Sequence, residues 1–291
     1  MGRYLHAIGA MVLAAASASA AAQLPFSLPG FGTGGGSAGG FKIGNLVNNL
    51  TKATRETSEA EEIRIGQEFA ATLLGAKPLV ADPGLQRYVN TLGRWIALQT
   101  ERPDLPWTFG VLDDPGFNAF ATPGGYIFVT RGLLERMGSE AELAGVLAHE
   151  IGHVLKKHHL AAVQKNAGFA LLGDFLNASG KGGNPEARQA LVNVGRKLYA
   201  SGLDKSDEYE ADRLGVVLAA RAGYDAYGLP SVLQTLQGKS ARDGDFTLLF
   251  KTHPLPADRI DALDRLMKDR FEALSGIDGP AVKDRLAEFH R

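Results

Sequence analysis

The feature that most constrains this chain is a pair of histidines four residues apart, His149 and His153, with Glu150 directly after the first. Four residues along an α-helix correspond to about 40° of rotation and about 6 Å of rise, so both imidazoles can reach one metal ion from one face. Glu150 then stands beside the ion, where its carboxylate can take a proton from a metal-activated water without ligating the metal. The spacing predicts a helix that carries two metal ligands and a general base.

The residues around this motif are those of a helix. Ser139 followed by Glu142 has the pattern of a capping box. Apolar residues then recur at three- and four-residue spacings and predict a buried side: Leu143, Val146, Leu147, Ile151 and Val154. Helical placement of both histidines is therefore expected.

Four basic residues, 156–159, follow the motif. Positive charge at a helix C-terminus complements the helix dipole, and this is the role we favour for His158 and His159. His159 also holds the last position of H-E-x-x-H-x-x-G-x-x-H, in which the glycine turns the chain back towards the metal. Lys156 stands at the glycine position, and a continuing helix would carry His159 about 240° round from His153. We therefore expect the third ligand elsewhere.

The remaining ligand has to be His, Asp or Glu, because the chain contains no cysteine. A second predicted helix begins near Ser206 or Asp207, and Glu208 and Asp212 share one of its faces four residues apart. One of these carboxylates can ligate a metal while the other orients a ligating imidazole through its free ring N–H. An acidic first turn by itself indicates only capping, but the upstream histidine pair favours the ligand interpretation.

Overall composition limits the partners. The chain has 291 residues, 45% of them hydrophobic, and a formal net charge of −1, which is typical of a packed globular protein. The near-zero charge gives no electrostatic reason to expect nucleic acid or an anionic membrane surface as partner. No nucleic-acid partner is therefore expected.

The first 45 residues have the pattern of an export leader and a linker. Basic residues precede a short apolar segment that ends in alanine-rich A-x-A sites, so residues 1–22 are predicted to be a cleaved signal peptide. Residues 23–45 are predicted to be a Gly-rich flexible linker, and residues 46–291 to be the domain that carries the histidine motif, with C-terminal helices. An exported, periplasmic location follows.

Helices and strands are expected before the motif. Helices are predicted over 59–74 and from Asp82 onwards, and strands over 107–112 and 125–130, with a turn-rich connection at 117–124. A strand next to the metal helix could offer its edge to an extended peptide. The alternative is a strand that lies wholly inside the sheet.

Together the motifs resemble a known family. Residues 149–153 combined with 208–212 resemble the HtpX and CAAX prenyl endopeptidase family of zinc metallopeptidases, the M48 peptidase family. Residues 118–134 resemble the family's segment before the metal helix, and 252–258 with the following Arg259 resemble its Thr-His-Pro block. These blocks occur in order between about residues 59 and 266.

The resemblance implies a mostly helical α+β fold of gluzincin type, with a small β-sheet beside the active-site helix. It implies one Zn²⁺ per chain held by His149, His153 and Glu208, with Glu150 as general base. Asp212 would support the ligands from behind and is sometimes regarded as a proton donor. Membrane-integral members carry transmembrane helices, whereas no apolar run long enough to span a bilayer follows the predicted signal here. The chain is therefore similar to the exported branch.

His253 has three possible roles. It can be a fourth zinc ligand that displaces water and keeps the enzyme latent, or a donor to the oxyanion formed during peptide hydrolysis. It can also be a histidine of a Pro-bounded loop with no part in the site.

The expected function is that of a zinc-dependent metalloendopeptidase that cleaves exported, unfolded or misassembled proteins in envelope quality control. The alternative is a chaperone-like or assembly module that binds client proteins and carries a latent zinc site closed by His253. Peripheral membrane association is compatible with either.

Overall fold

The structure is a computed structural model that describes residues 57–166, 185–240, 242–253, 256–268 and 270–271. The predicted signal peptide at 1–22 and the linker at 23–45 lie outside these residues, as does 272–291 at the end of the predicted domain.

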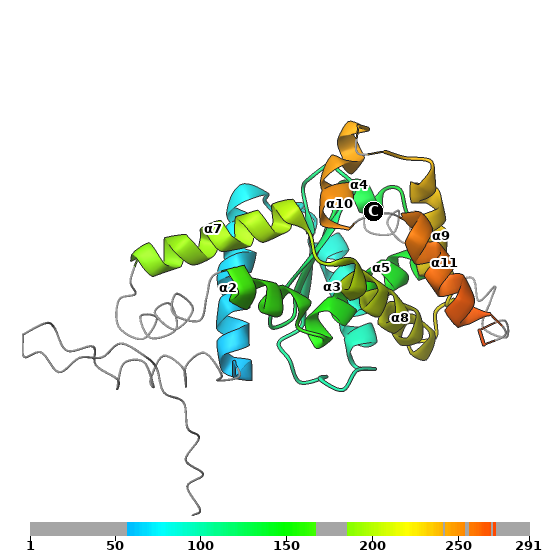
Figure 1. Ribbon diagram of the computed structural model, residues 1–291, viewed down its shortest axis with the longest axis horizontal. Coiled ribbons are helices and arrows are strands. Elements are labelled where there is room, and N and C mark those ends of the chain that lie inside the picture. The colour runs from blue at the N-terminus through cyan, green and yellow to red at the C-terminus, as the bar shows by residue number, and fades with distance from the viewer. Residues whose placement is uncertain (1–56, 167–184, 241, 254–255, 269, 272–291) are drawn as a thin grey trace, which may run out of the picture. The chain divides into compact units, whose positions relative to one another are not determined.

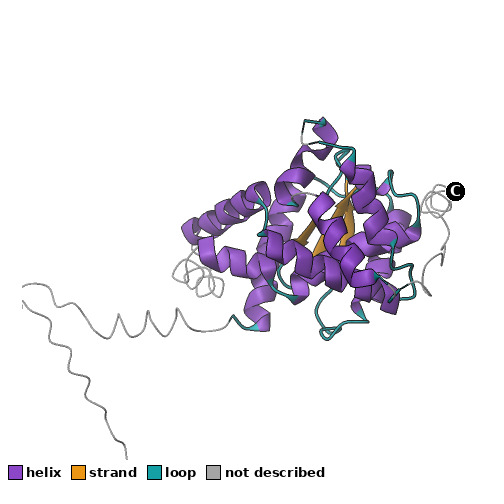
Figure 2. Cartoon of the chain, turned by 45° about the vertical axis from the view of Figure 1, so that its right-hand side comes forward, coloured by secondary structure: helices purple, strands orange, loops and turns teal. Residues whose placement is uncertain are grey.

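Helices dominate the described part of the chain, and a small sheet lies among them (Figure 2). The helices are α2 (Glu59–Ala76), α3 (Pro83–Ala97), α4 (Arg131–Leu134), α5 (Glu140–Leu155), α7 (Pro185–Ser201), α8 (Lys205–Arg221), α9 (Gly228–Gln237), α10 (Thr247–Thr252) and α11 (Pro256–Met267), with a 3₁₀ turn at η1 (Gly244–Phe246). The strands are β1 (Thr108–Leu112), β2 (Ala119–Thr122) and β3 (Tyr126–Thr130). The predicted mostly helical α+β class is confirmed.

Side-chain caps fix where the helices begin. Asp82 accepts hydrogen bonds from the first turn of α3, directly before Pro83, where a missing N–H costs nothing. Ser139 caps α5 by accepting from the backbone N–H of Glu142, as predicted. The Glu142 carboxylate does not return the bond to Ser139 but accepts from the Gly138 N–H at 2.7 Å.

The sheet differs from the predicted one. Its strand order is β1-β3-β2, with β1 parallel and β2 antiparallel to β3. The predicted turn-rich connection at 117–124 is wrong for residues 119–122, which form β2. Strand β2 is too short for a period-two pattern and is buried at every position. Gly124 and Gly125 take positive φ values of 75° and 97°, as the turn between β2 and β3 requires.

The position of the metal helix follows from this topology. Strand β3 is central, so the alternative of an internal strand is confirmed for residues 126–130, and β2 is the edge strand that packs against α5. Helix α5 is buried along nearly its whole length and lies against α8 and α9 (Figure 1). Two glycines permit the close crossing: a Cβ at Gly152 would lie 3.2 Å from Ala211, and one at Gly215 would lie 3.0 Å from the His149 backbone.

Among the described residues, no helix combines the length and the apolar character needed to cross a membrane.

Candidate metal centre

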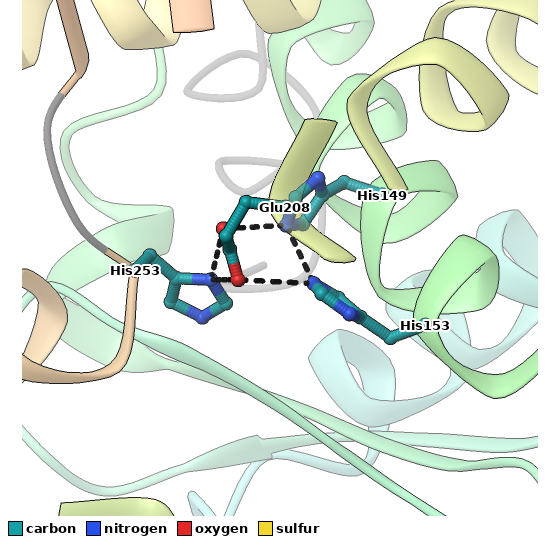
Figure 3. A group of neighbouring side chains, drawn as sticks. All are labelled: His149, His153, Glu208 and His253. Carbon is teal, nitrogen blue, oxygen red and sulfur yellow. Dashed lines mark hydrogen bonds and ion pairs between the residues drawn. The ribbon is translucent and has the colours of Figure 1, made fainter. Parts of the chain in front are cut away.

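Helices α5 and α8 bring together the predicted ligand residues (Figure 3). His149 and His153 point their Nε2 atoms at each other across 3.0 Å from adjacent turns of α5. Glu208, in the first turn of α8, lies with its carboxylate oxygens 3.7 Å from His149 Nε2 and 3.5 Å from His153 Nε2. Asp204 precedes α8, so the predicted caps Ser206 and Asp207 are wrong.

His253 completes the group from a third element. It follows α10, and its Nδ1 lies 3.1 and 2.9 Å from the two carboxylate oxygens of Glu208. The side chain is buried. Residues 254–255, which follow it, lie outside the described part of the chain. The structure thus places His253 among the predicted ligands. A loop histidine with no part in the site would not need to lie there.

The donor set fits a metal ion of zinc type. One ligand atom from each of His149, His153, Glu208 and His253 lies within 4.8 Å of the other three, and all four residues are buried. Tetrahedral zinc sites with bonds of about 2.0–2.1 Å place nitrogen and oxygen ligands about 3.3 Å apart. The observed separations of 3.0, 3.5 and 3.7 Å between the two histidines and Glu208 bracket that value. Buried carboxylates and imidazoles with this spacing are a suitable cradle for a divalent cation.

Glu150 lies beside this group without joining it. Its carboxylate is buried, Oε1 is 3.9 Å from His253 Nε2, and Oε2 has no hydrogen-bond partner among the described residues. Burial raises the pKa of Glu150, against the opposing effect of His253 and His149. A buried carboxylate oxygen is costly to leave unpaired. Glu150 Oε2 is therefore placed to receive a proton from a molecule bound in the site.

Behind the ligands, Asp212 and Arg259 form a second buried pair. Asp212 Oδ1 accepts from His149 Nδ1 at 3.0 Å. Arg259 donates to both oxygens of Asp212 at 2.6 and 2.8 Å and lies 3.2 Å from Glu208. Although burial alone would raise the pKa of each acid, Arg259 and His149 hold the pKa of Asp212 well below its usual range. His253 and Arg259 together lower the pKa of Glu208 to about 2. Both carboxylates are therefore ionised.

Arg259 is a site residue that the sequence reasoning did not identify as one. It lies on α11, 47 residues after Asp212, and a single arginine in a charged helix carries no periodic signal. Its position after the Thr-His-Pro block was the only available indication.

The chain leaves the metal helix differently from the prediction. Helix α5 ends at Leu155, and Lys157 adopts a positive φ of 57°, so the helix does not continue through residues 156–159. Lys157, one residue after the glycine position of the pattern H-E-x-x-H-x-x-G-x-x-H, thus makes a turn that was not expected without that glycine. His159 comes to lie 5.4 Å from the His153 ring, between ring centres, yet it is not part of the group of four donors.

His158 also has surroundings that the sequence did not predict. It is buried, and its Nδ1 lies 2.9 Å from His153 Nδ1. The ring thus contacts a predicted metal ligand, while the predicted role of His158 as a charge at the helix end stays a prediction. For His159 that predicted role is wrong, because burial lowers its pKa to about 3.

A small apolar cavity adjoins the donor group. It has a volume of about 40 Å³ and reaches from Glu150 and His149 to α9 and α10. Its apolar lining includes Phe117, Val146, Val232, Leu236 and Leu249.

Comparison with known proteins assigns the chain to a family. Residues 83–267, more than half of the chain, match the model of peptidase family M48. The chain belongs to peptidase family M48. Membership confirms both the family resemblance in the sequence and the expectation of a peptidase.

Individual M48 relatives extend the comparison. The chain is 30% identical over 222 residues to the beta-barrel assembly-enhancing protease of Escherichia coli O157:H7, an alignment covering 74% of this chain and 46% of the relative. It is 31% identical over 225 residues to the protein of the same name from Yersinia pestis, with coverage of 74% and 46%. It is 36% identical over 153 residues to the mitochondrial metalloendopeptidase OMA1 of Arabidopsis thaliana, covering 52% of this chain and 29% of the relative. The chain thus spans less than half the length of these relatives.

Proposed function

We propose that this M48 chain is a zinc-dependent metalloendopeptidase in which His149, His153 and Glu208 hold one Zn²⁺ and Glu150 is the general base. The observation that carries the proposal is the position of Glu150 Oε2, a buried oxygen without a hydrogen-bond partner among the described residues, beside four convergent donors.

The chemistry divides between the ion and the chain. Bound zinc would supply Lewis acidity towards a water molecule and the carbonyl of the scissile peptide. Glu150 accepts the proton of the attacking water on Oε2 and returns it to the leaving nitrogen. Its raised pKa favours holding that proton between the two transfers. The apolar cavity beside Glu150 positions a substrate side chain and excludes water from one flank of the bond.

Asp212 acts as a positioning residue rather than a proton donor. Arg259 donates to both carboxylate oxygens of Asp212, and the lowered pKa of Asp212 keeps that carboxylate ionised. Its contact to His149 Nδ1 holds the ring with Nε2 towards the donor group. Such carboxylate–histidine contacts raise ligand basicity and fix the tautomer.

The substrates we propose are exported proteins that are unfolded or misassembled. The A-x-A leader pattern at 1–22 supports export to the periplasm, and the name of the bacterial relatives connects them with β-barrel assembly. We propose envelope quality control as the setting, with peripheral membrane association compatible with it.

A second candidate function rests on His253. The His253 Nδ1 lies within hydrogen-bond distance of Glu208 and belongs to the donor group. The side chain can therefore occupy the metal-coordination position that a water molecule needs for hydrolysis. In that state the chain would be a latent peptidase, acting as a chaperone-like or assembly module that binds clients.

Turnover of an unfolded protein separates the two. The purified chain should cleave an unfolded polypeptide, lose this activity with a zinc chelator, and regain it when zinc is restored. If a protein loaded with one equivalent of zinc shows no cleavage while it binds the same polypeptide, the latent-module function is correct instead.

A further inference from the structure

Among the described residues, no carboxylate contacts Nδ1 of His153, one of the two proposed α5 ligands, whereas Asp212 contacts Nδ1 of His149. His149 Nδ1 lies 3.0 Å from Asp212, whereas His153 Nδ1 lies 2.9 Å from Nδ1 of another imidazole, His158. Both rings of this second pair are buried, with His153 at 0% and His158 at 6% exposure. A buried contact between two imidazoles needs a defined donor and a defined acceptor.

The turn after α5 creates the contact. On a continuing helix, residues five apart point about 140° away from each other and their rings cannot meet. Lys157 instead takes a φ of 57°, and a new helical segment begins at residue 158. The Lys157 carbonyl accepts from the Ala161 N–H at 2.8 Å in the first turn of that segment. The turn swings His158 back under His153.

The direction of the hydrogen bonds follows from the other ring nitrogens. His153 Nε2 faces His149 and Glu208 and is the atom that would bind the metal, so the proton of His153 has to reside on Nδ1. His158 Nδ1 must then accept, and the His158 proton must reside on Nε2. That atom faces Glu210 Oε2 at 3.3 Å, an acceptor. Glu210 Oε1 in turn pairs with Lys156 Nζ at 2.9 Å.

We propose that His158 is a positioning residue for His153. Its Nδ1 accepts a hydrogen bond from the His153 Nδ1–H, and its Nε2–H donates to Glu210. The inference rests on the proposed metal centre, within which it assigns a role to a histidine outside the donor group. Asp212 supports His149 directly, whereas the His158 imidazole lets a carboxylate at the surface support His153. The Glu210 side chain is 37% exposed, so its charge stays near water instead of adding to Glu208 and Asp212 in the interior.

Zinc affinity tests the proposal. The dissociation constant is measured by competition with a chromophoric chelator for the wild-type chain, His158→Leu and His158→Asn. Leucine fills the space without an acceptor, and asparagine retains an acceptor near the position of Nδ1. Losing such a contact typically weakens metal binding about 10- to 100-fold, so His158→Leu should lose this much and His158→Asn should recover most of it. Arg213→Ala, at an exposed position on α8, is the matched control.

The outcomes separate this inference from the proposed function. If the wild-type chain binds no zinc, the metal centre itself is wrong. If the wild type binds zinc and folded His158→Leu binds equally well, or if His158→Leu and His158→Asn are weakened equally, the positioning role is wrong. Nitrogen-15 NMR of the zinc-loaded wild type gives a second readout: we expect the His153 proton on Nδ1 and the His158 proton on Nε2. The opposite tautomer at His158 would overturn the proposal.

Discussion

Arg259 donates hydrogen bonds to both carboxylate oxygens of Asp212, at 2.6 and 2.8 Å, in the interior of the protein. The same Asp212 accepts from His149, so the arginine on α11 fixes the orientation of a proposed metal ligand on α5 through one intermediate. A buried ion pair adds little net stability, but removing one partner leaves a buried charge uncompensated.

Arg259→Ala should therefore lower the free energy of unfolding of the metal-free chain by about 3–5 kcal/mol. Arg259→Lys keeps the charge but not the two-pronged contact, and should lose less. Urea titration followed by circular dichroism measures both. Lys205→Ala, which breaks an exposed pair with Asp258, is the control, with an expected loss of about 0–1 kcal/mol. A loss at Arg259→Ala no larger than that of the control contradicts the account.

His253→Ala should raise peptidase activity. His253 Nδ1 lies 2.9 Å from Glu208, inside the donor group, so its removal frees a position for water and substrate. We expect kcat/KM towards an unfolded protein to rise at least about tenfold, equivalent to ~1.4 kcal/mol of activation free energy, with zinc content unchanged.

Lys251→Ala, exposed on α10, is the control for this variant and should leave activity unchanged. A fall in kcat for His253→Ala would mean that the histidine stabilises the oxyanion instead. No change would mean that it has no part in the reaction.

Leu236→Ala should change which bonds are cut. Leu236 lines the cavity of about 40 Å³ beside Glu150, and shortening it makes room for larger apolar side chains. Each methylene in such a pocket is worth about 1–3 kcal/mol of discrimination. Cleavage sites in a peptide mixture, mapped by mass spectrometry, should shift towards Leu, Met and Phe next to the cut bond. Leu98→Ala, at a leucine that directly follows α3 and is 60% exposed, is the matched control. An identical profile for the two variants rules out the cavity as a specificity pocket.

Zinc should stabilise the folded chain. Binding to the native state alone adds about 2.7 kcal/mol when free zinc is 100 times its dissociation constant. The melting temperature of the wild type should rise on addition of zinc, and that of His149→Ala should not, because a donor of the group is missing. Differential scanning calorimetry measures both. Equal rises for the two proteins would show that zinc acts outside this group.

Sequence spacing sufficed where chemistry and local structure coincide. The four-residue spacing of His149 and His153 and of Glu208 and Asp212 gives each pair a shared helix face, and the structure brings both pairs together. The cap at Ser139 was predictable for the same reason, since its signal is local.

Long-range geometry was not predictable in this way. Strand β2 could not be predicted because its four residues, mostly small and all buried, show no alternation of apolar and polar side chains. The turn at Lys157 could not be predicted because a lysine with a positive φ has no sequence signature. The contact between His158 and His153 depends on that turn and was therefore not predictable either. Arg259 lies 110 residues from His149 and enters the site through the packing of α11 on α8 and α9.

The most direct test of the central claim is the peptidase activity of Glu150→Gln at matched zinc content. Glutamine keeps the size of the side chain but cannot accept the proton that Oε2 is proposed to take. We predict one zinc per chain, an unchanged melting temperature and a loss of kcat of at least about 100-fold, within the range of general acid–base catalysis. A zinc-loaded Glu150→Gln protein that cleaves an unfolded substrate at the wild-type rate would contradict the account.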